Sequence, residues 1–126
     1  MQDRPVSEAF FDTNILIDWL NANAAATAEL KLYGRRRISR IVWAEVLAGE
    51  PDATRGSVER LIAGFEIVEV DAVIAARAAE VRYRTRMKLM DALIFATAQL
   101  HQGLLVTRNT KDFPATMPGI RVPYQL

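Results

Sequence analysis

The chain has 126 residues, 51% of them hydrophobic, with sixteen Lys and Arg residues against fifteen Asp and Glu. This length is typical of one domain, so we expect a single domain over residues 1–126. The net charge of +1 excludes a strong overall field for nucleic acid, and the absence of cysteine excludes disulfides and thiolate metal sites. No apolar run approaches the ~18 residues that span a bilayer, and the N-terminus shows no apolar leader, so we expect a cytoplasmic protein.

The first half of the chain alternates apolar runs with helical patterns. Segment 6–14, "VSEAFFDTN", predicts a short strand that is apolar on both faces, which suits a parallel sheet covered on both sides. A second short strand is expected around Ile38, with Ser39 capping the helix that follows. Helices are expected over 15–21, over 24–33 with Gly34 as C-terminal cap, over 41–48 before Gly49, and over 57–64 after a loop at 51–57.

The second half repeats this alternation. Strands are expected over 65–70, over 104–107 and, more weakly, over 119–123. An amphipathic surface helix is expected to begin at Asp71 and to run to 86. Segment 91–102 is apolar nearly all round, which predicts a buried helix that stops at Gly103. Segment 108–113 predicts a loop or a single helical turn.

Strands that alternate with helices predict a parallel α/β sheet with right-handed crossovers. We expect a three-layer α/β/α sandwich around a central, mainly parallel sheet of four to five short strands. Ligands of such sheets bind beyond the carboxyl ends of the strands. Asp12 follows the first strand and segment 107–112 follows the fourth, so both should reach the same edge of the sheet.

Four acidic residues are candidates for a site at that edge: Asp12, Glu45, Asp91 and Asp112. Each also has a structural explanation, because Asp12 and Asp91 suit helix N-caps and Asp112 suits a turn. Glu45 lies among apolar residues in "IVWAEVLAG", where a buried carboxylate needs either a cation or an arginine partner. From the residues alone both interpretations stay open for each acid.

Taken together, the four acids favour a metal site. Two carboxylates about 5 Å apart repel by roughly 3 kcal/mol at an effective dielectric near 20. Several such pairs would rival the stability of a small domain, about 5–15 kcal/mol, unless a cation or protons neutralise them. Hard oxygen ligands without a cysteine or histidine cluster favour Mg²⁺ or Mn²⁺ over zinc. His101 is the only histidine, and a structural role is expected for it.

With these acids in place, the chain resembles the PIN-domain family, and in particular the VapC-type ribonuclease toxins of toxin–antitoxin pairs. The resemblance rests on "FFDTNILID", "ISRIVWAEVLAG", "DALIFATAQL" and "LLVTRNTKDF", which follow one another in the family's order over almost the whole chain. It implies a PIN-like fold. Many relatives have proline before the aspartate that opens the late helix, whereas this chain has Met90, a difference that removes no ligand.

The resemblance also implies roles for individual residues. The family's metal-binding and catalytic acids match Asp12, Glu45, Asp91 and Asp112, and the supporting polar positions match Asn14, Thr107 and Asn109. It implies a Mg²⁺- or Mn²⁺-dependent endoribonuclease that hydrolyses phosphodiester bonds with metal-activated water and leaves 5′-phosphate and 3′-hydroxyl ends. The expected partners are an RNA substrate, a cognate antitoxin that covers the active-site groove, and a second copy in a homodimer, with no membrane.

Two basic runs are candidates for RNA contacts beside the acids. They comprise Arg35, Arg36 and Arg37 in the first run, and Arg82, Arg84, Arg86 and Lys88 in the second. Runs of this kind are also common on solvated faces. Phosphate contacts would give salt-dependent affinity with little sequence preference.

Two other functional classes remain to be distinguished. A phosphorelay receiver domain is also a small α/β protein with an acidic pocket, but "FFDTN" lacks paired acids and Asp71 is a poor phosphoacceptor. A catalytically inert PIN-like binding module would keep the fold while its acids pair with arginines.

Overall fold

The computed structural model describes residues 8–126, so the predicted strand start at Val6 and Ser7 lies outside the described residues. The strands are Glu8–Phe11 (β1), Arg35–Ser39 (β2), Glu66–Val68 (β3), Leu104–Val106 (β4) and Ile120–Arg121 (β5). The helices are Thr13–Leu20 (α1), Ala24–Leu30 (α2), Arg40–Ala48 (α3), Asp52–Ile62 (α4), Ala72–Thr85 (α5) and Leu89–Leu100 (α6). Among the described residues, no helix combines the length and the apolar character needed to cross a membrane.

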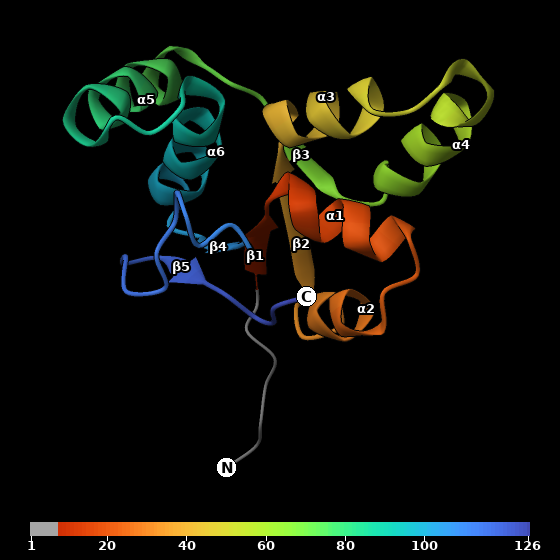
Figure 1. Cartoon of the computed structure of the whole chain (residues 1–126). Coiled ribbons are helices and arrows are strands. Elements are labelled where there is room, and N and C mark those ends of the chain that lie inside the picture. The colour runs from red at the N-terminus through yellow and green to blue at the C-terminus, as the bar shows by residue number, and fades with distance from the viewer. Residues whose placement is uncertain (1–7) are drawn as a thin grey trace.

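The five strands form one sheet in the order β3-β2-β1-β4-β5, and every pairing between neighbours is parallel. Figure 1 shows α5 and α6 on one side of the strands and α1 and α2 on the other. The predicted α/β/α sandwich with a parallel sheet is therefore confirmed. Because β1 is central, the chain leaves the sheet after Phe11 between β2 and β4, where the strand order reverses direction.

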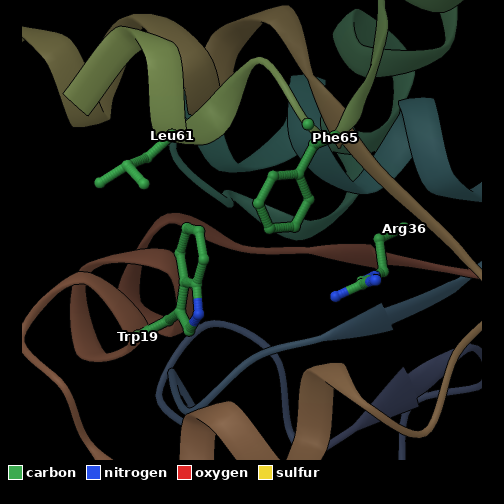
Figure 2. Close-up of a pocket in the computed structure, with 5 residues that line it drawn as sticks. Trp19, Arg36, Leu61 and Phe65 are labelled. Atoms are coloured by element: carbon green, nitrogen blue, oxygen red, sulfur yellow. The ribbon is translucent and has the colours of Figure 1, made fainter. Parts of the chain in front are cut away.

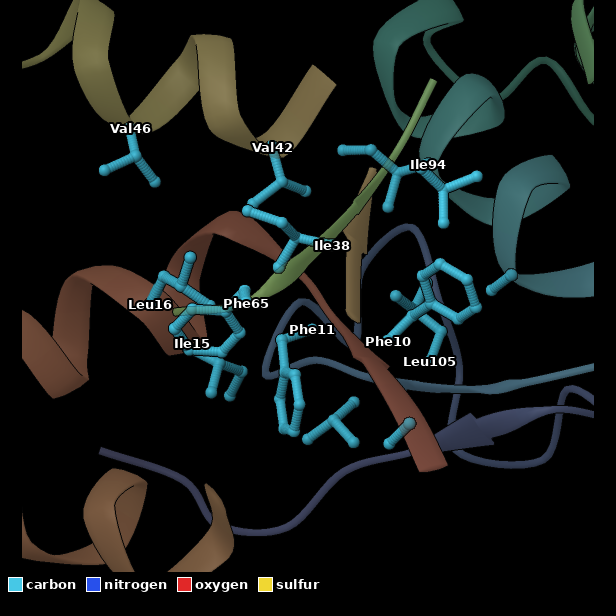
Figure 3. Packing of buried hydrophobic residues seen from close by; sticks show 14 of the residues in the cluster. Phe10, Phe11, Ile15, Leu16, Ile38, Val42, Val46, Phe65, Ile94 and Leu105 are labelled. Carbon is cyan, nitrogen blue, oxygen red and sulfur yellow. The ribbon is translucent and has the colours of Figure 1, made fainter. Parts of the chain in front are cut away.

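The two phenylalanines of β1 show why its sequence is apolar on both faces. Successive residues of a strand point to opposite sides of the sheet. Phe10 packs near His101 at the end of α6, whereas Phe11 packs against Tyr33 and Phe65 on the other side. Both rings are almost fully buried, and Figure 3 shows them within the apolar cluster that spans the sheet.

Three predicted helix boundaries are wrong, each for a local reason. The segment expected to be a loop at 51–57 belongs to α4, because Pro51 stands at the N-cap and Asp52 places a negative charge in the first turn. Gly34 is not the cap of α2, which ends at Leu30 with Lys31 as its C-cap. Helix α6 begins at Leu89, so Asp91 lies inside its first turn and is not the N-cap.

Several predicted caps are confirmed. Ser39 caps α3 by accepting a hydrogen bond from the Ile41 N–H at 3.0 Å. Asp71 caps α5 in the same way through the Ile74 N–H, at 2.8 Å. These caps fix where the helices start relative to the carboxyl ends of the strands.

Candidate active site

Asp12 lies at the carboxyl edge of the sheet, directly after β1, and is only 4% exposed. It is the N-cap of α1 and accepts a hydrogen bond from the Thr13 N–H at 2.8 Å. Its other carboxylate oxygen accepts hydrogen bonds from the Thr107 hydroxyl at 2.7 Å and from the Asn14 amide at 3.2 Å. The capping and the site interpretations of Asp12 are thus compatible, because one oxygen caps the helix while the other faces the polar cluster.

Glu45 reaches the same edge from α3. Its carboxylate accepts a hydrogen bond from the Thr13 hydroxyl at 2.6 Å, so Thr13, which lies 32 positions before Glu45, joins it to Asp12. Burial is the main cause that raises the pKa of Asp12, and the charge of Glu45 raises it further. Hydrogen bonds from Thr107, Thr13 and Asn14 oppose this rise because they stabilise the ionised carboxylate.

Asp91 extends the cluster from the first turn of α6. Burial, together with the charges of Asp12, Asp112 and Glu45, raises its pKa to about 6. Charges act on a pKa mainly over short distances, so the other three carboxylates lie within electrostatic reach of Asp91. The structure therefore brings together the four acids that the sequence selected, although they come from β1, α3, α6 and the loop after β4.

A chain of polar contacts connects Asp12 with Asp112. Thr107 donates to Asp12, and its hydroxyl oxygen accepts a hydrogen bond from the Asn109 N–H at 3.0 Å. Asn109 in turn donates its side-chain amide to Asp112 at 3.0 Å and accepts the Asp112 N–H at 3.2 Å. Asn14 accepts the Arg108 N–H at 3.1 Å, which ties α1 to the same loop. The three supporting positions expected from the resemblance thus all contact the cluster.

None of the four acids takes part in an ion pair with the described residues, 8–126. Other carboxylates of the chain do, such as Asp18 with Arg108 at 2.6 Å and Glu66 with Arg35 at 2.7 Å. The arginine partners that would explain the acids structurally therefore lie elsewhere. No cation of residues 8–126 compensates the mutual repulsion of the four acids through an ion pair.

The donor chemistry of this cluster fits a hard divalent cation. It offers carboxylate, hydroxyl and amide oxygens, while His101 lies by Arg37, where its Nδ1 is 3.4 Å from the guanidinium. Within residues 8–126, no group of three or more acidic or histidine side chains is arranged to hold a metal ion as the side chains stand, so a bound ion would have few direct carboxylate contacts. An open arrangement suits Mg²⁺ or Mn²⁺, because Mg²⁺ keeps several waters and needs only one or two carboxylates.

The first basic run does not reach this edge. Arg35, Arg36 and Arg37 begin β2, so they lie at the amino edge of the parallel sheet, opposite Asp12. Arg35 binds Glu66, and the buried Arg37 binds Glu8 at 3.0 Å and lies over the Phe10 ring. The expectation that this run lies beside the acids is therefore wrong, because strand direction carries it to the other end.

The second basic run divides into two parts. Arg84 faces Glu80 on the surface of α5 at 3.8 Å. Arg82 donates to the carbonyls of Arg86 and Met87, at 3.3 and 2.8 Å, and so holds the turn after α5. Arg86 and Lys88 are exposed in that turn, which leads directly into α6.

The sequence interpretation missed three features of this region. The first is Thr13, which donates a hydrogen bond to Glu45. Its position between Asp12 and Asn14 was the only indication of such a role in the sequence. The second is the ion pair of Arg108 with buried Asp18, which Tyr124 completes with a hydrogen bond at 2.8 Å. The third is Lys111, which is exposed in the hollow that Asp112 lines.

A separate pocket lies between α1, α4 and β2. Trp19, Arg36, Leu61, Gly64 and Phe65 line it, and Figure 2 shows the Trp19 and Phe65 rings within it. The rings meet edge to face with centroids 5.5 Å apart. Leu61 is 55% exposed there, which leaves an apolar side chain at the surface.

Comparison with known proteins agrees with this geometry. The PIN domain family model matches residues 9–116. Ribonuclease VapC10 of Mycobacterium tuberculosis is 37% identical over 111 residues, which cover 82% of this chain and 84% of that protein. A toxin–antitoxin complex from Klebsiella pneumoniae contains a chain with 41% identity and a TM-score of 0.83, covering 94% of this chain and 99% of that one. FitAcB from Neisseria gonorrhoeae matches with 23% identity and a TM-score of 0.77, covering 94% of this chain and 99% of that one. At this identity the likeness supports a shared fold and nothing further. The chain belongs to the PIN domain family.

Proposed function

We propose that this protein is the ribonuclease toxin of a toxin–antitoxin pair and hydrolyses RNA phosphodiester bonds with the help of Mg²⁺ or Mn²⁺. One observation carries the proposal: the charges of Asp12, Asp112 and Glu45 help to raise the pKa of Asp91, and none of these four carboxylates has a cationic partner among the described residues. The likeness to Ribonuclease VapC10 supports RNA as the substrate.

In this proposal Asp12, Glu45 and Asp91 hold the divalent ion, and Asp112 completes or adjusts the set. A bound ion supplies an activated water and stabilises negative charge on the phosphoryl oxygens. Asn14 and Thr107 hold the Asp12 carboxylate in a fixed orientation through the hydrogen bonds at 3.2 and 2.7 Å. Thr13 does the same for Glu45 at 2.6 Å, which leaves the other carboxylate oxygens for the ion.

The two other functional classes fit less well. An inert module requires arginines on the acids, whereas the ion pairs of residues 8–126 involve other carboxylates. A receiver domain has the strand order 2-1-3-4-5, whereas this sheet has the order β3-β2-β1-β4-β5. Asp71, the only phosphoacceptor candidate, is occupied as the cap of α5.

The test is cleavage of a mixed cellular RNA pool by the purified chain with Mn²⁺, with Mg²⁺ and with EDTA. We expect cutting in the first two conditions and none in the third. Asp12→Asn keeps the cap oxygen but removes one full negative charge from the site, so we expect a loss of at least about 100-fold in rate. Asp52→Asn is the matched control, because Asp52 lies in the first turn of α4 and pairs with Arg55 at the surface. Equal cutting by wild type and Asp12→Asn would refute the proposal.

The proposed partners follow from the relatives. The Klebsiella pneumoniae structure is described as a toxin–antitoxin complex, so an antitoxin that covers the acidic groove is part of the proposal. A homodimer is proposed on the same family grounds. Adding the antitoxin to the cleavage reaction should suppress cutting in proportion to the complex formed.

A further inference from the structure

We propose that Arg86, Lys88 and Lys111 form a phosphate-binding surface that holds the RNA backbone next to the carboxylates. We call these three residues the cationic rim. The inference deepens the proposed function, since it names the surface along which the substrate strand enters the site. It also separates these residues from the five other arginines of the two basic runs and from other surface charges.

The position of the cationic rim is the first argument. Arg86 and Lys111 line one hollow together with Asp112, although 25 positions separate them in the sequence. Lys88 is the N-cap residue of α6, and Asp91 follows in the first turn of that helix. Arg86 and Lys111 therefore lie beside Asp112, and Lys88 stands three positions before Asp91 at the start of the same helix, so phosphates flanking a bound scissile group could reach all three cations.

The second argument is that the three cations are uncommitted. All three side chains are exposed, and within residues 8–126 none of them forms an ion pair. Other arginines at the surface are engaged, such as Arg84 with Glu80 and the partly exposed Arg40 with Glu69. Free cations beside a repelling acidic cluster could neutralise it if they reached the carboxylates, but no such pair forms. Their charge is left for a polyanion.

The third argument is the backbone of the turn. Arg86 adopts a left-handed conformation with φ of 64°, which disfavours every residue with a Cβ relative to glycine. The Arg82 guanidinium stabilises this turn by donating to the Arg86 and Met87 carbonyls, and the Thr85 hydroxyl accepts the Met87 N–H at 3.2 Å. A glycine would relieve the strain, so an arginine at this position points to a use for its side chain.

The test measures binding of a fluorescein-labelled 20-nucleotide single-stranded RNA in the Asp91→Asn background, so that the probe stays intact. The rim triple variant carries Arg86→Gly, Lys88→Gln and Lys111→Gln. The control triple variant carries Lys31→Gln, Arg36→Gln and Arg60→Gln, three exposed residues that likewise lack ion pairs within residues 8–126. Both triple variants change the net charge equally, so they share any effect of overall charge.

Each phosphate contact to a single strand contributes a slope of about −0.7 to log K against log salt. Removing three contacts should therefore flatten the slope by about 2. At 0.1 M salt one contact is worth roughly fivefold in affinity, since 0.1 to the power −0.7 is about 5, so the rim triple variant should bind about 100-fold more weakly. The control triple variant should keep nearly all of the affinity and slope.

The Arg86→Gly substitution guards against a loss of binding that is caused by misfolding, because glycine suits the left-handed conformation of this turn. The single variant should melt at or above the wild-type temperature while it binds RNA more weakly. If rim and control triple variants give the same affinity and slope, the cationic rim is wrong, even where the unmodified chain cuts RNA with Mn²⁺. If the rim variant loses binding but the unmodified chain cuts no RNA, the rim is supported and the nuclease proposal fails.

Discussion

Asp91 combines partial burial with the repulsion of three other carboxylates, and these causes raise its pKa from 3.8 to about 6. A carboxyl group with a raised pKa binds more protons in the folded state than in the unfolded chain between these two values. The free energy of unfolding must therefore fall as pH rises through this window. The loss of stability that ionised Asp91 causes is absent below about pH 4 and complete above about pH 7.

We expect Asp91→Asn to stabilise the metal-free protein at pH 7.5 and to have little effect at pH 4. One pKa unit corresponds to about 1.4 kcal/mol, so the full shift would give about 3 kcal/mol, and solvent screening of this half-exposed group reduces this to about 1 kcal/mol. Denaturant unfolding at both pH values in EDTA measures the difference. A stabilisation of equal size at both values would show that charge repulsion is not its cause.

At the same scale, the residue types and their order were enough to select the four acids. Sequence could not show that Thr13 bridges Asp12 and Glu45, because that contact depends on the angle between α1 and α3. It also could not show that Lys111 faces the turn after α5. The first basic run was misplaced although a signal existed: residues that begin a parallel strand lie at the edge opposite those that follow its end.

The junction of α6 and β4 illustrates how elements are held together around β1. The sequence predicted that Gly103 stops α6, but the helix ends at Leu100 with His101 as its C-cap, and Gln102 takes the left-handed conformation. A Cβ at Gly103 would lie 2.6 Å from the Phe10 ring. Gly103 is therefore required by the close approach of β1.

Gly103→Ala should destabilise the protein by about 1–3 kcal/mol, the usual cost of overpacking a core. The ring of Phe10 is buried on the α6 face and cannot move aside without disturbing its contacts with Arg37 and His101. Thermal unfolding measures the effect, with Gly56→Ala as control. Gly56 lies inside α4 with its nearest neighbour at 3.7 Å, so alanine should be tolerated there and should favour the helix. Similar melting temperatures for the two variants would contradict the close approach.

Element order and type followed from the alternation of apolar runs, whereas element ends did not. The early start of α4 depends on Pro51 and Asp52, whose turn-like composition predicted a loop. Both residues are also favourable at helix starts. Only the packing of Val58 and Ile62 against the core favours a helix over a loop here. Sequence also did not predict that α6 starts before Asp91. Leu89 and Met90 are apolar but exposed, so they do not continue the buried pattern of the helix.

For the whole molecule, two buried carboxylates fasten the C-terminal part of the chain to the first two helices. Asp18 of α1 binds Arg108 and Tyr124, and Glu29 of α2 binds Arg121 and Tyr33. The hydrogen bond from Arg108 is the main cause that lowers the pKa of Asp18. For Glu29, burial raises the pKa, but the hydrogen bonds from Arg121 and Tyr33 and the charge of Arg121 together outweigh it, so the pKa is lowered. These contacts close the fold around the loop that carries Thr107, Asn109 and Asp112. The acidic cluster is thus held together by distant contacts despite its own repulsion.

If the acids repel within a fold that other contacts hold closed, a divalent ion should stabilise the whole molecule. At a concentration one hundred times its dissociation constant, Mn²⁺ should add about 2.7 kcal/mol to the free energy of unfolding. The Asp91→Asn variant should be more stable than wild type in EDTA and less stable than wild type in saturating Mn²⁺. Asp52→Asn should follow wild type in both conditions, because Asp52 contacts Arg55 at the surface. Thermal unfolding across a Mn²⁺ titration gives the melting temperatures of the three proteins for this comparison. An equal gain for wild type and Asp91→Asn would mean that Mn²⁺ binds away from Asp91, and the fold would then tolerate its acidic cluster without an ion.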